Sequence, residues 1–194
     1  MTQPPRATGY AAVVLAGGAG RRLGGVDKPA LEVGGERLLD RVLAVVAEAA
    51  QVVVVGPRRP VERDVTWVLE DPPRGGPAAA LAAGLAAVDA DQVVVLAADL
   101  PLLDAAVVQS LRDAAAGHDG AVLVDDGGRE QLLVGCWSTA ALRGAVERAG
   151  SLVDASLRRL LSGLDRAAVP SAGPRPAWLD CDTPDDVRRA EELL

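Results

Sequence analysis

The chain has 194 residues, of which 49% are hydrophobic, and this is enough for one α/β domain with its own core. Its net charge of −7 at neutral pH argues against nucleic acid or an anionic membrane as the main partner. The longest apolar run, Pro77 to Val88, is shorter than the roughly 18–20 residues that a membrane span needs. With 2% aromatic residues and no Phe, the core must be built from Val, Leu and Ala.

The cysteines and the N-terminus both point to the cytoplasm. Cys136 and Cys181 are far apart and form no C-x-x-C pair, which is typical of reduced thiols. Residues 1–9 contain no apolar signal core. We therefore expect a cytoplasmic protein with a flexible N-terminal tail over 1–9 and a single domain over 10–194.

The first expected element is a buried strand that ends in a glycine-rich stretch. The apolar run from Tyr10 to Ala16 predicts a strand over about 10–15. The glycines that follow are Gly17, Gly18, Gly20, Gly24 and Gly25. Backbone N–H groups in such a stretch can approach an anion closely, because no Cβ keeps them away. Arg21, Arg22 and Lys28 would neutralise that anion, and Lys28 is the only lysine in the chain. The pattern favours a phosphate cradle over a plain glycine turn.

Two common nucleotide-binding motifs do not match this stretch. A P-loop requires Gly-Lys-Ser/Thr, but two residues separate Gly25 from Lys28. A dinucleotide-binding fingerprint requires a third glycine where Leu23 stands. It also requires an acidic residue after the second strand, and none follows Val52–Val55. The cradle must therefore belong to another motif.

Strands and helices alternate through the first half of the chain. A short extended piece and a turn are expected over 30–36. The next expected strands are Val52–Val55, Val65–Leu69 and Gln92–Ala97. The first is wholly apolar and the last is apolar after Gln92, as in buried parallel strands. The expected helices run over about 38–48, over Pro77–Val88, and from Asp104 as the N-cap to about Ala116.

The second half is less regular. Strands are expected at Gly120–Val124 and Gln131–Trp137, joined by a hairpin turn at 125–128. Helices are expected at roughly Thr139–Arg148 and Asp154–Ser162, and a loop over 170–176 leads to a last strand at Ala177–Leu179. Thr183 and Pro184 begin a closing helix. The whole pattern predicts an α/β fold, a doubly wound, mostly parallel sheet with helices on both faces.

Candidate site residues follow the ends of the strands, where ligands bind in such sheets. Asp99 comes directly after a buried strand, and a carboxylate there suits Mg²⁺; the alternative is an Asp that starts a turn before Pro101. Asp180 and Asp182 offer a second carboxylate, unless Asp182 only caps the last helix. His118, the only histidine, lies in a polar turn and is expected to be a plain surface residue. A Ser-His-Asp hydrolase or a His-ligated zinc site therefore has no support.

The glycine stretch resembles the signature L-A-G-G-x-x-x-R-x-G-x-x-D-K of the MobA-like NTP transferase family. Its members make molybdenum cofactor dinucleotides and nucleotide sugars. The matching residues are Leu15, Ala16, Gly17, Gly18, Arg22, Gly24, Asp27 and Lys28. The family's metal-binding Asp-x-Pro matches Asp99 and Pro101, and its late motif matches Asp180, Asp182, Thr183, Pro184 and Asp186. The resemblance extends over 12–194 and implies the Rossmann-like nucleotide-diphospho-sugar transferase fold.

The resemblance implies a Mg²⁺-dependent enzyme of the molybdenum cofactor guanylyltransferase type. Such an enzyme transfers GMP from GTP to the phosphate of molybdopterin and releases pyrophosphate. The implied catalytic residues are Lys28, Arg22 and Asp99, with Asp99 and Asp182 as metal ligands. The implied nucleotide-binding residues are Leu15, Ala16, Gly17, Gly18, Gly20, Arg22, Lys28, Asp71, Gly76 and Asp99.

Asp71 is the candidate that would select the base. An ionised carboxylate only accepts hydrogen bonds, so its two oxygens match the two adjacent N–H donors of guanine, whereas cytosine offers one donor beside an acceptor. The alternative is that Asp71 only starts the turn before Pro72. A cytidylyltransferase of the same pathway, another small-phosphate nucleotidyltransferase and an inactive nucleotide-binding partner subunit remain open as functions. The acceptor and the oligomeric state are not determined by these patterns.

Overall fold

The structure is a computed structural model that describes residues 9–17, 26–71, 73, 75–153 and 155–194. The strands of its main sheet are β1 Tyr10–Leu15, β4 Gln51–Val55, β5 Thr66–Val68, β6 Gln92–Ala97, β7 Gly120–Val124, β8 Glu130–Ser138 and β9 Arg166–Pro170. The helices are α1 Leu38–Val45, α2 Pro77–Ala86, α3 Ala105–Ala114, α4 Thr139–Ala149, α5 Leu157–Leu161 and α6 Pro184–Leu193. A 3-10 turn, η2 Lys28–Ala30, precedes a hairpin of β2 Glu32–Val33 and β3 Glu36–Arg37.

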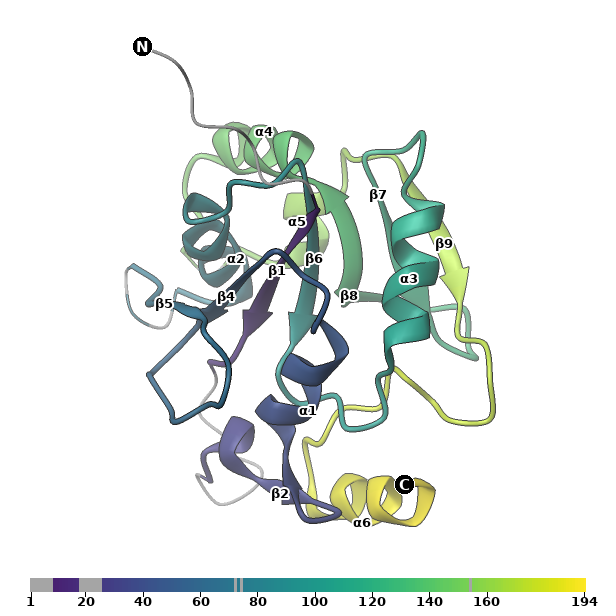
Figure 1. The fold of residues 1–194 in the computed structure, drawn as a ribbon. Helices are drawn as coiled ribbons and strands as arrows, with labels where there is room; N and C mark the ends of the chain where they lie inside the picture. The colour runs from purple at the N-terminus through teal and green to yellow at the C-terminus, as the bar shows by residue number, and fades with distance from the viewer. Residues whose placement is uncertain (1–8, 18–25, 72, 74, 154) are drawn as a thin grey trace.

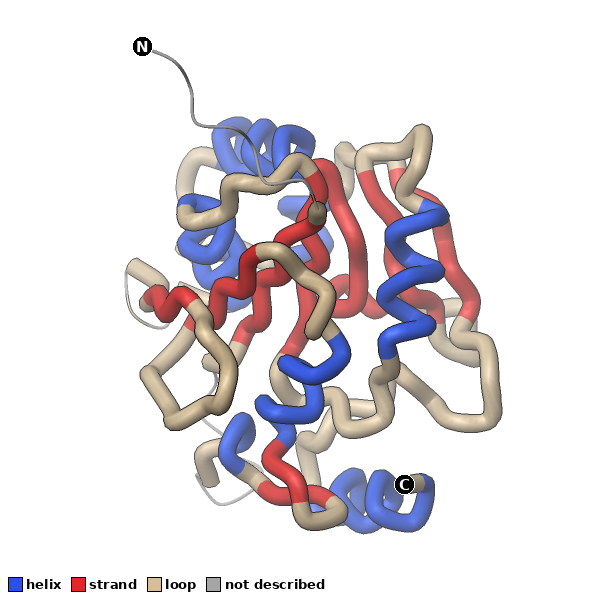
Figure 2. Tube along the Cα trace, viewed as in Figure 1, coloured by secondary structure: helices blue, strands red, loops and turns tan. Residues whose placement is uncertain are grey.

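The sheet lies between two layers of helices (Figures 1 and 2). Its seven strands follow the order β5-β4-β1-β6-β8-β7-β9, and every strand except β8 runs in the same direction. This arrangement confirms the predicted α/β fold with a mostly parallel sheet. The long crossovers between parallel strands place helices on both faces, which is how such a sheet buries both of its apolar sides.

Alternate side chains of β1 belong to two different cores. Val14 packs in the core that α1 and α3 cover, whereas Val13 packs in the core that α2, α4 and α5 cover. All six residues of β1 are buried. Successive side chains of a strand point to opposite faces, so only a strand that is apolar at every position can be covered on both sides.

A third, smaller apolar cluster lies at the end of the molecule where the parallel strands end. Its buried members are Val33, Leu38, Leu102, Leu179, Cys181 and Ala190. These residues come from β2, α1, α6 and two loops, so the cluster joins the last helix to the β2–β3 hairpin. Figure 1 shows α6 and β2 side by side at this end.

The expected strand at Ala177–Leu179 is wrong. These residues form a turn, closed by a hydrogen bond of 2.9 Å from the Leu179 N–H to the Pro176 carbonyl. The last strand of the chain is instead β9, which pairs in parallel with β7 at one edge of the sheet. Its sequence, Arg-Ala-Ala-Val-Pro, has little β propensity of its own. The ladder with β7 stabilises it, and this pairing is not visible in local sequence.

The predicted helix caps agree with the structure better than the helix lengths do. Asp104 accepts a hydrogen bond of 3.0 Å from the Val107 N–H, and Thr183 forms a capping box with Asp186. The helix expected over Asp154–Ser162 is only one short helix, α5, and Asp154 lies outside the described residues. The tail expected over residues 1–9 also lies outside the described residues, except for Gly9. None of the described helices is long and apolar enough to cross a membrane.

Candidate nucleotide-binding site

Lys28 lies against two aspartates that are far from it in the sequence. Its ammonium group donates to the Asp99 carboxylate at 3.2 Å and forms a second, short hydrogen bond to Asp182. The side chains of Lys28, Asp99 and Asp182 are 16%, 21% and 34% exposed, so the group is partly screened from water and still reachable. Three residues that the sequence singled out separately therefore meet at one point.

Each member of this group is positioned by a different element. Asp99 follows β6, whose pairing with β1 is continued by a hydrogen bond of 3.1 Å from the Ala98 N–H to the Leu15 carbonyl. Lys28 begins the 3-10 turn η2, which buries Pro29. Asp182 reaches the site because the Cys181 N–H donates to the Asp99 carbonyl at 3.1 Å.

Burial of Cys181 fixes this last connection. Cys181 is fully buried in the third apolar cluster and has no disulfide partner, as is also true of Cys136. Burial raises the pKa of the Cys181 thiol to about 12, so the side chain acts as a small apolar group. The aspartates on either side of Cys181 are thereby held at the ends of β1 and β6.

The electrostatics of the site follow from these contacts. Partial burial disfavours the charged form of Lys28, but the hydrogen bonds and charges of Asp182 and Asp99 outweigh it and raise the pKa of the ammonium group. For Asp180 the surroundings disfavour the charged form of the side chain. Desolvation and the nearby charges of Asp182 and Asp99 raise the pKa of its carboxyl group. The site therefore carries more carboxylate charge than one lysine neutralises.

Only some of the other predicted site residues lie within the described part of the chain. Leu15, Ala16 and Gly17 lie at the end of β1, and a side chain at Gly17 would meet nothing within 4 Å, which leaves open space beside this backbone. Gly76 caps α2 with a φ of 91°, a conformation that favours glycine. Asp71 is exposed beyond the end of β5, at the same end of the sheet. Gly18, Gly20 and Arg22 lie outside the described residues, so their roles stay predictions.

A pocket of about 340 Å³ opens on the β8 side of Asp99. Its walls come from the first half of β8, from α5 and from residues 178–180, and they include Asp99, Asp180, Arg129, Arg158 and Trp178. The indole N–H of Trp178 is buried and has no hydrogen-bond partner in the part of the chain that the structure describes. The sequence analysis missed Arg129, Arg158 and Trp178, since no motif or spacing distinguishes them.

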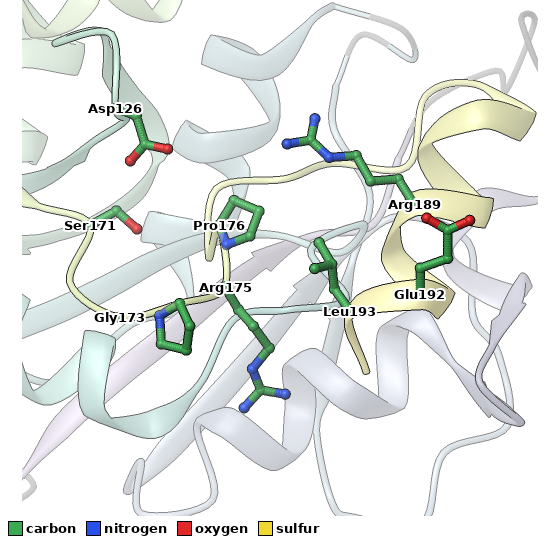
Figure 3. Close-up of a pocket in the computed structure, with 9 residues that line it drawn as sticks. Asp126, Ser171, Gly173, Arg175, Pro176, Arg189, Glu192 and Leu193 are labelled. Atoms are coloured by element: carbon green, nitrogen blue, oxygen red, sulfur yellow. The ribbon is translucent and has the colours of Figure 1, made fainter.

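A second pocket, of about 350 Å³, lies away from this group (Figure 3). It is formed by α6, the loop after β9 and the turn before β8, and it contains Arg175 and Arg189. In Figure 3 the two guanidinium groups lie on opposite sides of Pro176 and do not converge on one point. His118 is also remote from the site. As expected it is a surface residue, at hydrogen-bond distance (2.7 Å) from Asp165.

The donor set at Lys28 suits a hard divalent cation. Within the described residues, no three His, Cys, Asp or Glu side chains are grouped as a ready metal centre. Mg²⁺ does not need one, because it is usually bound by one or two carboxylates together with substrate phosphates and water. Asp99 and Asp182 are two carboxylates that already share one cation, the Lys28 ammonium group. Their chemistry fits a magnesium ion.

Comparison with known proteins identifies the family. A family model described as the MobA-like NTP transferase domain matches residues 12–169, which is most of the chain. The chain belongs to the MobA-like NTP transferase family. It is therefore a nucleotidyltransferase, and its sequence is similar throughout to a molybdenum cofactor guanylyltransferase from Mesorhizobium japonicum. The two are 32% identical over 202 residues, which cover 95% of this chain and 95% of the relative.

Solved structures share the family's fold. A molybdopterin-guanine dinucleotide biosynthesis protein A from Archaeoglobus fulgidus superposes with a TM-score of 0.74 at 24% identity, over 94% of this chain and 97% of that one. A 2-C-methyl-D-erythritol 4-phosphate cytidylyltransferase from Thermus thermophilus superposes with a TM-score of 0.70 at 25% identity, with the same coverage. The fold is thus common to proteins named for guanylyl and cytidylyl chemistry and does not decide the base.

Proposed function

We propose that this member of the family transfers GMP from GTP to the phosphate of molybdopterin and releases pyrophosphate. The observation that carries the proposal is the grouping of Lys28, Asp99 and Asp182 at the ends of β1 and β6. The relative from Mesorhizobium japonicum, which this chain matches over 95% of both lengths, is named for this activity. In the reaction, an acceptor phosphate oxygen forms a bond to the α-phosphorus of GTP, and the bond from that phosphorus to the β-phosphate oxygen breaks.

The nucleophile in this reaction needs no base from the protein. A phosphate monoester is already an anion at neutral pH, so no proton has to be removed from the attacking oxygen. This agrees with the site, where the described residues near Lys28 include carboxylates and arginines but no histidine. The chain's task is to hold two anions together and to neutralise the charge that moves onto the leaving pyrophosphate.

Lys28 is the residue that we assign to this neutralisation. Its ammonium group lies next to the end of β1, where Gly17 leaves open space for a triphosphate. A compact ammonium group on a flexible stem can turn from the two carboxylates to the phosphates without a change of backbone. Charge stabilisation of this kind is worth roughly 3–4 kcal/mol when one donor supplies it.

Asp99 and Asp182 would hold Mg²⁺ when Lys28 turns to the phosphates. A bound metal ion would supply positive charge beside the two carboxylates and the phosphates of the substrate. The two carboxylates keep their geometry because the Cys181 N–H ties residues 180–182 to the Asp99 carbonyl. Lys28 would then neutralise phosphate oxygens, and the metal would neutralise the two carboxylates that Lys28 now contacts.

The pocket beside Asp99 is our proposed acceptor site. It adjoins the carboxylate that would hold the metal, and it offers Arg129 and Arg158 to the acceptor phosphate. These arginines matter because the chain as a whole carries a net charge of −7. The indole N–H of Trp178, which has no partner among the described residues, provides a donor for a polar group of the acceptor.

Asp71 is our proposed base-selecting residue. It is exposed at the end of β5, on the same edge of the sheet as Asp99, and its carboxylate can accept both N–H donors of the guanine edge. A contact of this kind favours GTP over CTP by about 1–3 kcal/mol.

Pyrophosphate release tests the proposal directly. The purified chain is incubated with Mg²⁺, molybdopterin and each of the four common nucleoside triphosphates, and then with other small phosphates in place of molybdopterin. We expect release with GTP and molybdopterin, and we expect Asp71→Asn to lose most of the preference for GTP over CTP. A preference of the unsubstituted chain for CTP would contradict the guanylyl assignment. Binding of GTP without any release would instead favour an inactive partner subunit.

A further inference from the structure

Arg59 contacts residues on both sides of the glycine stretch. Its side chain extends from the loop between β4 and β5 and is 11% exposed. Its Nε donates to one oxygen of the Asp27 carboxylate at 2.7 Å, and Nη2 donates to the other. The remaining nitrogen, Nη1, donates to the Ala16 carbonyl at 3.2 Å and to the Pro57 carbonyl at 2.9 Å. One planar group thus joins a residue before the stretch to a residue after it.

The backbone that leads from β4 to Arg59 also contacts the end of β1. A hydrogen bond of 2.8 Å runs from the Ala16 N–H to the Val55 carbonyl. Gly56 has a φ of 147°, and a Cβ there would stand 2.7 Å from the Ala16 carbonyl oxygen. The loop that carries Arg59 therefore leaves β4 in direct contact with Ala16, which fixes the distance that the guanidinium group spans.

The contact with Asp27 fixes the position of the backbone from which the Lys28 side chain extends. Asp27 is the residue immediately before Lys28 and lies at the N-cap of the 3-10 turn η2, with no capping hydrogen bond from its own side chain. Instead, both of its oxygens bind Arg59, and this pair holds the pKa of the Asp27 carboxyl group below its usual range. The next side chain along reaches Asp99 and Asp182.

We propose that Arg59 is a positioning residue for triphosphate binding, acting through Ala16 and Asp27. It touches none of the reacting atoms in this scheme. It fixes the distance between the end of β1 and the start of η2. The open backbone at Gly17 and the ammonium group of Lys28 then face the same phosphates. This inference rests on the proposed nucleotidyl transfer and adds to it a residue outside the glycine signature.

The chemistry of the contact requires arginine. Its planar fork binds a carboxylate through two parallel hydrogen bonds and still directs a third nitrogen to the carbonyl groups. A lysine has one nitrogen and cannot hold Ala16 and Asp27 together with the same geometry. Arg59→Lys therefore keeps the charge and removes the bridge, which makes it the sharpest single test of positioning.

Arg63 supplies a matched control. It lies in the same loop and donates to the carbonyls of Leu43 and Val46 at 3.2 and 2.9 Å. These carbonyls are at the last turn of α1, next to the start of β1 and away from Lys28. Arg63→Ala removes a loop anchor of the same kind without touching the glycine stretch, so it measures the cost of a merely structural change.

The experiment compares dissociation constants for GTP, KM and kcat, and urea unfolding for five variants of the full chain. They are Arg59→Ala, Arg59→Lys, Asp27→Asn, Arg63→Ala and the double variant Arg59→Ala/Asp27→Asn. We expect both Arg59 variants to weaken GTP binding and raise KM by about tenfold or more, with a smaller change in kcat. Arg63→Ala should lose similar stability and bind GTP normally. Asp27→Asn tests the same contact if Arg59→Ala does not fold.

The double variant shows whether the two residues act together. If Arg59 acts through Asp27, removing both should weaken binding by no more than about twofold beyond Arg59→Ala alone. Effects that multiply, or an Arg59→Lys variant that binds GTP as the unsubstituted chain does, would overturn the proposal. A chain that binds another triphosphate in place of GTP contradicts the guanylyl assignment alone, and the same variants are then compared with that triphosphate. A chain that binds no triphosphate contradicts both.

Discussion

At the scale of single residues, Lys28 is the counter-ion of two carboxylates and the proposed partner of the triphosphate. Its ammonium group cannot serve both sets of oxygens at full strength, because each contact is short-ranged in a site that is partly open to water. In the structure this group neutralises Asp99 and Asp182, so binding to a triphosphate would require it to exchange partners. Two predictions follow from this exchange of partners.

Lys28→Ala should fold and should lose turnover. The side chain contributes little to any apolar core, so we expect only a small change in the free energy of unfolding. Loss of the ammonium group should lower kcat by two orders of magnitude or more, or about 3–4 kcal/mol. Pyrophosphate release at saturating GTP measures this, with urea unfolding as the control for folding. Turnover close to that of the unsubstituted chain would exclude Lys28 from the cradle.

Lys28→Met should bind a divalent cation more tightly in the absence of nucleotide. The substitution keeps most of the apolar stem and removes the charge that competes for Asp99 and Asp182. We expect the affinity for Mn²⁺, used as a spectroscopic substitute for Mg²⁺, to rise about tenfold. Electron paramagnetic resonance of free Mn²⁺ measures it without any turnover. Adding Asp99→Asn should abolish the gain; an unchanged affinity in Lys28→Met would show that these carboxylates do not bind the metal.

At the scale of elements, α2 packs unusually close to the sheet because of its small residues. Its ten residues are Ala, Gly and Leu after the first proline, and Gly84 is buried against β1 and β4. A Cβ at Gly84 would lie 2.6 Å from a methyl group of Val13 and 3.0 Å from one of Val55. Valine side chains are short and stiff, so they cannot move aside as the end of a long side chain can.

Gly84→Ala should therefore destabilise the chain although alanine is the better helix former. Helix propensity alone favours alanine by about 1 kcal/mol, but overpacking of a close helix–sheet contact costs about 1–3 kcal/mol. Gly144→Ala in α4 is the control, since its Cβ would meet only the mobile end of Arg148, at 3.1 Å. We expect that variant to be unchanged or more stable. Urea unfolding measures both, and a Gly84→Ala variant as stable as Gly144→Ala would contradict the packing argument.

At the scale of the whole molecule, the far edge of the sheet depends on an ion pair. Arg166 at the start of β9 binds both oxygens of Glu130 in β8 at 2.9 Å, with β7 lying between the two strands. Both side chains are mostly buried, with exposed fractions of 20% and 26%. The hydrogen bonds from Arg166 lower the pKa of the Glu130 carboxyl group. This contact reaches across β7 and stabilises the position of β9, whose own sequence has little β propensity.

The Glu130 carboxylate should make stability depend on pH in the acid range. A carboxyl group whose pKa is lower in the folded state stabilises the fold above its unfolded pKa of about 4, and this contribution is lost as the pH falls through the folded pKa. We expect Glu130→Gln to cost about 1 kcal/mol at pH 7 and much less at pH 3. Urea unfolding at the two pH values measures the difference. An equal loss at both would mean that packing, and not the charge, is responsible.

Much of the fold was predictable from local sequence because its signals are local. The apolar runs at β1 and β6 have the length and composition of strands buried on both faces, and Asp104 and Thr183 cap helices through bonds within one turn. The glycine stretch and Asp99 could be placed at strand ends for the same reason. Family and fold class both follow from these short-range patterns.

The tertiary structure alone decided which distant residues meet. Lys28 and Asp182 are 154 positions apart, and Arg59 and Asp27 are 32 apart, so neither pair leaves a periodic trace in the sequence. The last strand is β9 and not Ala177–Leu179, because a ladder to β7 stabilises a segment of low β propensity while Leu179 and Cys181 are buried beside α6. Pairing, burial and charge neutralisation are free energies of contacts between segments, and they exist only once the chain has folded.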